Sequence, residues 1–150
     1  MDFVRPWLAI GKYRDTRSRD ALREAGVSAM LLLARDLQQE GIRSRYLAVE
    51  DGEALPLPLL AQGVYFVSRA RRDRDTVLVA CGAGISRSAT FTIAALCMIE
   101  GLALKTAYIQ VKATRPIIKP HPKLWDSLCE FLGERVGFRE TYAWDEEATR

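Results

Sequence analysis

Cys81 and Arg87 are the two residues whose types and spacing best suit a chemical reaction. A cysteine thiolate is a strong nucleophile, and a planar guanidinium binds two oxygens of a phosphate at once. The residues between them read Gly-Ala-Gly-Ile-Ser, a loop short enough to wrap around one anion. We therefore predict a phosphate pocket with a nucleophile at its floor.

The elements on either side of this loop are those that an anion site needs. An apolar run over 76–80 predicts a strand that delivers the cysteine, and an apolar segment over 86–100 predicts a helix. The helix N-terminus supplies unpaired N–H groups and about half a positive charge, which favour both phosphate and thiolate. Glycines let the loop turn its N–H groups inward. The predicted phosphate-binding residues are Gly82, Ala83, Gly84, Ile85, Ser86 and Arg87.

Two serines border the arginine. Ser86 either caps the helix, a position that serine favours, or hydrogen-bonds the sulfur or the loop. Ser88 is a candidate catalytic residue, because its hydroxyl can stabilise the thiolate when it leaves a phosphorylated enzyme.

The same Cys-x5-Arg spacing occurs a second time, from Cys129 to Arg135. Here the intervening residues include two glutamates, which repel phosphate, and the segment has the apolar periodicity of an amphipathic helix. We interpret Cys129, and likewise Cys97, as a packing residue.

Other glycine-loop and metal sites do not fit the sequence. A dinucleotide fingerprint starting at Gly82 needs glycine where Arg87 stands, and no lysine followed by serine or threonine completes a nucleotide-binding loop. One histidine and three scattered cysteines give no metal-ligand spacing. We expect neither a metal nor another cofactor.

Composition narrows the class of protein. The 150 residues, 49% of them hydrophobic, suffice for one domain with a sizeable core, and a net charge of +3 gives no sign of a nucleic-acid partner. No apolar stretch reaches membrane-spanning length. Three cysteines without evident pairing suit a reducing cytoplasm. The run of Arg69, Arg71, Arg72 and Arg74 is read as a solvated helix end or, alternatively, as steering for an anionic substrate.

Strand-like and helix-like patterns alternate along the chain. Strands are predicted at 7–11, 27–34, 44–49 and 76–80, and helices at 18–25, 35–40, 57–71, 86–100, 104–114 and 121–135. This alternation predicts an α/β fold with a central, mostly parallel sheet of about four to five strands flanked by helices. Residues 136–150 are polar and predict a loosely attached C-terminal tail.

A thiolate that attacks phosphorus also needs an acid to protonate the leaving oxygen. Glu50, Asp51 and Glu53 follow the predicted strand 44–49, at the same edge of the sheet as Cys81. The residue types alone leave all three as candidates.

The segment 80–90 resembles the signature of the dual-specificity protein phosphatases, within the protein tyrosine phosphatase superfamily. The resemblance extends over about 6–133: residues 7–11 resemble the opening strand, 46–51 the strand before the general acid, and 114–120 the loop beside the active site. It implies a tyrosine-phosphatase-like fold, with 1–135 as the catalytic domain.

By this resemblance Cys81 is the nucleophile and Asp51 is first the general acid and then the base that activates water. Arg87 and the N–H groups of 82–87 hold a phospho-cysteine intermediate, without a metal. The implied substrates are phosphotyrosine and phosphoserine or phosphothreonine of proteins. Two alternatives stay open: a non-catalytic phosphoprotein-binding pseudophosphatase, and a phosphatase for a small phosphorylated molecule or glycan.

Two positions depart from the family pattern. Ala80 stands where the family has a histidine that orders the loop, so we expect retained activity that rises at more alkaline pH. His121 stands where the family often has asparagine, and it either begins a helix or contacts substrate.

Overall fold

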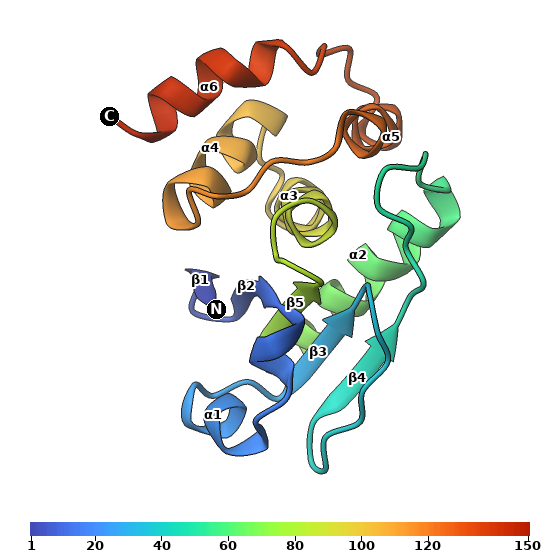
Figure 1. Cartoon of the computed structure of the whole chain (residues 1–150), viewed down its shortest axis with the longest axis vertical. Helices are drawn as coiled ribbons and strands as arrows, with labels where there is room; N and C mark the ends of the chain where they lie inside the picture. Colours follow the sequence, from blue (N-terminus) through green and yellow to red (C-terminus); the bar gives the residue numbers. More distant parts are fainter.

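The computed structural model describes all residues, 1–150, and centres on one five-stranded sheet (Figure 1). The spatial order is β1-β2-β5-β3-β4, and only β1 runs antiparallel to its neighbour. The strands are β1 (Asp2–Arg5), β2 (Leu8–Lys12), β3 (Ala29–Leu32), β4 (Arg43–Tyr46) and β5 (Val77–Cys81). The predicted α/β class with a mostly parallel sheet is confirmed.

Helices cover both faces of this sheet unequally. In Figure 1, α1 lies on one side and the larger helical layer, with α3 at its centre, on the other. The helices are α1 (Arg19–Glu24), α2 (Leu57–Arg72), α3 (Arg87–Glu100), α4 (Leu104–Thr114), α5 (Pro122–Leu132) and α6 (Glu140–Ala148), with a 3-10 turn at Tyr13–Thr16. None of them combines the length and apolar character needed to cross a bilayer.

Strand β5 divides its side chains between two cores. All five of its residues are buried. Val77, Val79 and Cys81 face a cluster of 31 buried residues on the α3 side, whereas Leu78 and Ala80 face a smaller cluster of 8 on the other side. Because successive strand residues point to opposite faces, this alternation places the cysteine at the start of α3 and turns Ala80 away from it.

The predicted tail differs most from what the residues form. Glu140–Ala148 is helix α6, and its Trp144 packs edge-on against Tyr108 and Trp125, with ring centroids 5.7 and 5.9 Å apart. The expectation of loose attachment is therefore wrong, because the partly buried Trp144 ring and the buried Thr141 dock a helix that is otherwise polar.

Two smaller predictions also need correction. The segment 35–40 forms no helix: residues 35–38 have no regular structure and Gln39 makes an isolated bridge to Ile42. Strand β1 was not expected. The edge strand β1 forms an antiparallel hairpin with β2, and this pairing stabilises four residues that by themselves carry little strand pattern. The strand predicted at 44–49 is shorter, ends at Tyr46 and continues as an extended segment toward Asp51.

Candidate active site

The predicted nucleophile, arginine and acid meet at one hollow in the surface. Cys81 ends β5, Arg87 begins α3, and Asp51 comes from the loop that follows β4. Together with Ala83, Ile85 and Ser86 these three residues line an open pocket of about 180 Å³. Glu50 and Glu53, the other two candidate acids, line a separate hollow beside the start of α2.

Cys81 lies at the floor of the pocket beside Ser88. Its side chain is only 3% exposed, and Sγ lies 3.2 Å from the fully buried Ser88 Oγ. A neutral thiol donates to the hydroxyl oxygen, and a thiolate accepts from the same hydroxyl. Ser88 can therefore stabilise the charged sulfur, as the sequence predicts.

The loop carbonyls all bind donors away from the pocket. Tyr13 N–H donates to the Gly82 carbonyl at 3.3 Å, and Lys119 N–H donates to the Ile85 carbonyl at 2.8 Å. At the end of the loop the Ser86 carbonyl accepts from Thr90 N–H, as in any helical turn.

Arg115 binds the two carbonyls in the middle of the loop. Its Nε donates to Gly84 O at 2.8 Å and its Nη2 to Ala83 O at 3.3 Å, while Nη1 pairs with Asp2 Oδ2 at 2.7 Å. Arg115 is 8% exposed, so its bonds to the loop carbonyls are shielded from water, whereas its pair with Asp2 lies at the surface. Arg115 is the main site residue that the sequence did not single out individually, although the segment 114–120 was noted.

The N–H groups of the loop are consequently free. None of the N–H groups of residues 82–86 has an acceptor within the protein. Because each peptide unit directs its C=O and N–H in opposite directions, outward carbonyls leave the N–H groups facing the pocket, as in other anion-binding nests. The loop is thus arranged to accept an anion with several oxygens.

A close approach requires glycine at position 84, and a milder one limits the space at Gly82. Gly84 has a φ of +69°, and a Cβ there would lie 2.7 Å from both Gly11 O and Arg115 Nη2. A Cβ on Gly82 would lie 3.2 Å from Arg87 Nη2. Alanine at either position would push against the groups that hold the loop in place.

Arg87 links the phosphate loop to the acid loop. Its Nη1 donates to the Val49 carbonyl at 3.1 Å, two residues before Asp51. Because that bond uses one end of the guanidinium, the remaining N–H groups stay available to an anion in the pocket.

Ser86 and His121 form a second link between the two loops. Ser86 occupies the N-cap position of α3 but makes no capping bond, and its Oγ instead accepts from His121 N–H at 2.8 Å. The capping interpretation of Ser86 is therefore wrong. The His121 ring caps α5, with Nδ1 accepting from Lys123 N–H at 3.1 Å, and a Cβ on Gly52 would lie 3.7 Å from its Nε2. His121 thus begins a helix, as one of the two interpretations predicts, and also lies beside the acid loop.

The remaining cysteines lie in the packed interior. Cys129 is 6% exposed in α5, so the second Cys-x5-Arg match forms no pocket. Burial, followed by the Glu134 carboxylate, raises the pKa of Cys97 to about 11, and burial raises that of Cys129 to about 11 as well. All three cysteines are free thiols, and only Cys81 opens onto a pocket.

Comparison with known proteins places this geometry in a family. Residues 10–133 match the family described as dual specificity phosphatase, catalytic domain. The chain belongs to the dual specificity phosphatases. This family consists of cysteine-dependent protein phosphatases, and its match spans every pocket residue described above.

Curated dual specificity phosphatases align over most of the chain. Dual specificity protein phosphatase 22-B of Danio rerio is 30% identical over 91% of this chain and 77% of its own length. Human dual specificity protein phosphatase 8 is 30% identical over 85% of this chain. The chain spans 21% of that human protein and 57% of mouse dual specificity protein phosphatase 15.

Solved dual specificity phosphatase structures share the fold. Human DUSP28 superposes with a TM-score of 0.82 at 30% identity, over 87% of this chain and 94% of that chain. DUSP15 gives a TM-score of 0.80 at 25% identity, over 98% of this chain and 93% of that chain. A human tyrosine phosphatase-like serine/threonine/tyrosine-interacting protein has the same fold, with a TM-score of 0.82 at 23% identity, over 89% of this chain and 95% of that chain.

Proposed function

We propose that this dual specificity phosphatase hydrolyses phosphomonoesters of protein side chains through a phospho-cysteine intermediate. The observation that carries the proposal is the set of unpaired N–H groups of residues 82–86, which face the same pocket as Cys81. Fixed donors of this kind stabilise the charge that develops on the transferred phosphoryl group.

In the first step the Cys81 thiolate attacks phosphorus and the phosphorus–oxygen bond to the substrate breaks. Asp51 gives its proton to the departing oxygen, so that tyrosine, serine or threonine leaves as a neutral hydroxyl. Arg87 and the loop N–H groups bind the three remaining phosphoryl oxygens.

In the second step water attacks phosphorus and the sulfur–phosphorus bond breaks. Asp51, now a carboxylate, takes a proton from the water, and phosphate leaves the pocket. Ser88, 3.2 Å from the sulfur, donates its hydroxyl to the released thiolate. The cycle restores every group to its starting protonation state and uses no metal.

A protein substrate suits the openness of the pocket. The hollow of about 180 Å³ is lined by six residues and opens to solvent. A shallow pocket admits the short side chains of phosphoserine and phosphothreonine as well as phosphotyrosine. The three free cysteines fit a reducing cytoplasm as the place of action.

Hydrolysis of p-nitrophenyl phosphate tests the proposal. We expect Cys81→Ser to lower kcat by at least about 10³-fold, because it removes the attacking thiolate. Cys129→Ser, the matched control, is expected to retain activity. Asp51→Asn is expected to lower the rate by about 10²-fold or more on tyrosine phosphate, and by less on p-nitrophenyl phosphate, whose leaving group needs no proton. Glu53→Gln is its control.

The alternative of a non-catalytic phosphoprotein-binding module is favoured by one observation, the absence of a histidine at position 80. Equal inactivity of wild type and Cys81→Ser, together with phosphopeptide binding by both, would establish it. A panel of phosphopeptides, inositol phosphates, nucleotides and phosphorylated glycans separates protein substrates from small ones.

A further inference from the structure

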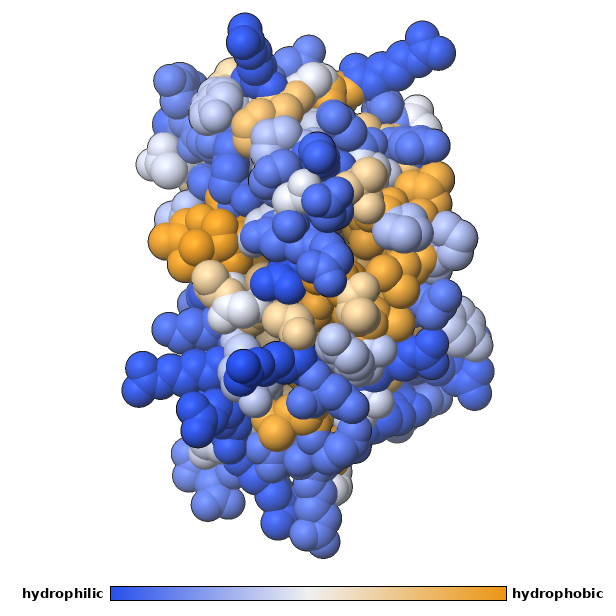
Figure 2. All heavy atoms as spheres, turned by 45° about the vertical axis from the view of Figure 1, so that its right-hand side comes forward, coloured by the Kyte–Doolittle hydropathy of each residue, from blue (hydrophilic) through white to orange (hydrophobic).

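A third hollow lies between the edge strand β4 and helix α2. Its volume is about 170 Å³, and none of its residues is shared with the phosphate pocket. Figure 2 turns this side of the molecule toward the viewer, and hydrophilic groups cover its lower part, around the sheet edge. The six residues that line the hollow are Arg43, Arg45, Gln62, Tyr65, Phe66 and Arg69, which we call the arginine–aromatic pocket.

The pocket lies away from the catalytic end of the sheet. Strand β4 is parallel to β3, and β3 is parallel to β5, which ends at Cys81. Arg43 is the first residue of β4 and is hydrogen-bonded to the turn that precedes β5. A molecule held in the arginine–aromatic pocket therefore leaves the phosphate loop unobstructed.

The pocket carries positive charge that the protein itself does not neutralise. Arg43 pairs with Asp73 at 3.2 Å and with Asp75 at 2.7 Å, and Arg69 reaches only Asp73, at 3.7 Å. Arg45 has no carboxylate partner, and its only bond is to the neutral Gln62 amide oxygen at 3.0 Å. Three cations thus share two carboxylates.

The pocket also has aromatic walls. Tyr65 is 60% exposed, which is high for a large aromatic side chain, and the Arg43 guanidinium lies 5.9 Å from the centroid of the Phe66 ring. Exposed tyrosines beside arginines are the residue types that contribute most to binding energy at protein interfaces. A free inorganic anion would gain nothing from these walls, whereas a peptide side chain would.

The neighbouring backbone suits an extended peptide. Strand β4 pairs with β3 on one side only and forms the edge of the sheet. Because strand residues alternate between faces, Arg43 and Arg45 share the face that α2 covers. A segment that lies along this edge can bond to the free β4 backbone while its side chains reach the arginine–aromatic pocket.

We propose that the arginine–aromatic pocket is a docking site for an acidic, aromatic-containing segment of a partner protein. The excess guanidinium charge selects carboxylates, and Tyr65 and Phe66 select an apolar or aromatic side chain between them. If that partner is a substrate, docking raises the local concentration of its phosphorylated residue at the phosphate loop. This last role rests on the proposed phosphatase function; the docking does not.

Fluorescence anisotropy with a labelled Glu-Asp-Glu-Phe-Glu-Asp-Leu peptide tests docking on the whole chain. We expect Arg45→Glu combined with Arg69→Glu to weaken binding by at least about tenfold, and added salt to weaken binding to the wild type. Arg43 is left unchanged, because its two ion pairs support the fold. Arg72→Glu reverses one charge on the same helix outside the pocket, half the charge change of the double variant, and as the control it is expected to bind within about twofold of the wild type.

A Tyr65→Ser variant tests the aromatic wall without a change of charge. We expect it to lower the affinity for the peptide by about threefold or more. Two results would overturn the proposal. One is an equal loss of binding in Arg72→Glu and in the double variant, and the other is unaltered binding in both the double variant and Tyr65→Ser. Either result would mean that the arginines only keep the edge of the sheet soluble. Displacement of the peptide by millimolar phosphate alone would overturn it in favour of a small-anion site.

Kinetics then separate docking from catalysis. With a phosphopeptide that carries the same acidic segment, the double variant is expected to raise KM about tenfold and to leave kcat unchanged, while p-nitrophenyl phosphate hydrolysis stays unaffected. Peptide binding without any hydrolysis would refute the phosphatase proposal and leave docking intact. An equal loss on both substrates would show that the variants damage the fold and would contradict a separate docking site.

Discussion

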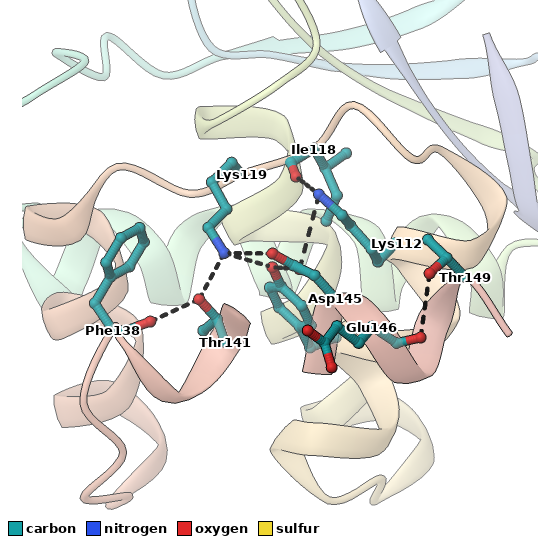
Figure 3. Close-up of polar contacts among 9 residues, drawn as sticks. Lys112, Ile118, Lys119, Phe138, Thr141, Asp145, Glu146 and Thr149 are labelled. Atoms are coloured by element: carbon teal, nitrogen blue, oxygen red, sulfur yellow. Dashed lines mark hydrogen bonds and ion pairs between the residues drawn. The ribbon is translucent and has the colours of Figure 1, made fainter. Parts of the chain in front are cut away.

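Lys119 and Asp145 form an ion pair, with Nζ and Oδ2 2.8 Å apart, that connects the last helix to the phosphate loop. The backbone N–H of Lys119 donates to the Ile85 carbonyl in that loop, while its side chain reaches α6 (Figure 3). Thr141 Oγ1 accepts from the same Nζ at 2.6 Å, and the Tyr142 ring centroid lies 4.2 Å away. Helix α6 is therefore part of the support of the active site.

Asp145→Asn is expected to destabilise the protein in a pH-dependent manner. Burial alone would raise the pKa of Asp145, but hydrogen bonds from Lys119 and Tyr108 and the charge of Lys112 outweigh it and hold that pKa below its usual value. A carboxyl group with a lowered pKa stabilises the folded protein at a pH above the pKa it has in the unfolded chain, about 4. This stabilisation is lost as the pH falls through the lower pKa of the folded state. We expect the free energy of unfolding of the variant to be about 1–3 kcal/mol lower than that of the wild type at pH 7, and the difference to shrink toward pH 3.

Urea unfolding at pH 7, 5 and 3.5 measures this difference. Glu147→Gln is the control, since its pair with Lys105 is exposed and is worth less than about 1 kcal/mol. Equal losses at every pH would contradict the role of the Asp145 charge.

Gly84→Ala is expected to lower kcat/KM by about 10²-fold or more, because its Cβ would displace Arg115 and thereby the loop N–H groups. Gly101→Ala is a matched control: it has the same φ of +69°, but nothing lies within 4 Å of the added Cβ. We expect the control to lose about 1–2 kcal/mol of stability and to keep its activity within about twofold. Similar kinetics in the two variants would mean that the close approach at position 84 has no catalytic consequence.

Iodoacetamide at pH 7 is expected to modify Cys81 at least about tenfold faster than the other two cysteines. Cys97 and Cys129, with pKa values raised to about 11, are almost entirely protonated at this pH, whereas Cys81 lines the phosphate pocket, where the reagent can enter. Mass spectrometry of digested protein measures each rate. Added phosphate should slow only the Cys81 reaction, and uniform labelling of all three sites would contradict the assignment.

Ala80→His is expected to reduce stability. Ala80 is 2% exposed and packs in the smaller core with Leu22, Met30 and Leu32, so an imidazole there would overfill the site at a cost of about 1–3 kcal/mol. Thermal unfolding compared with Ala80→Ser, a small substitution, measures that cost. If the variant folds, the acid limb of its pH–rate profile should move to lower pH, as the family histidine would predict. An unchanged melting temperature would show that the smaller core has room for a larger side chain.

The sequence predicts the parts of the site that are local. Gly82 and Gly84, the strand before Cys81 and the helix after it follow from conformational rules that act over a few residues. The choice of Asp51 over Glu50 and Glu53 needed the family resemblance, and the pocket lining agrees with it. The catalytic role of Asp51 stays a prediction, which the Asp51→Asn variant tests.

The supports of the loop were not predictable, because their partners are far apart in the chain. Arg115 lies 31 residues from Gly84 and 113 from Asp2, and no local pattern distinguishes it from a surface arginine. Helix α6 has a polar sequence, and only Trp144 and Asp145 reveal that it docks. Strand β1 pairs with its neighbour in the chain, β2, and residues 35–40 form no helix although Leu37 packs against the smaller core.

The donors that hold the loop carbonyls have a consequence for a chain that is still being synthesised. Tyr13 precedes the phosphate loop in the chain, and Arg115 and Lys119 follow it. A nascent chain that has completed Cys81 and Arg87 but not Arg115 carries the reactive thiol without the anion cradle. Competence for phosphate transfer therefore requires translation to pass Lys119, well after Cys81 and Arg87 have been made.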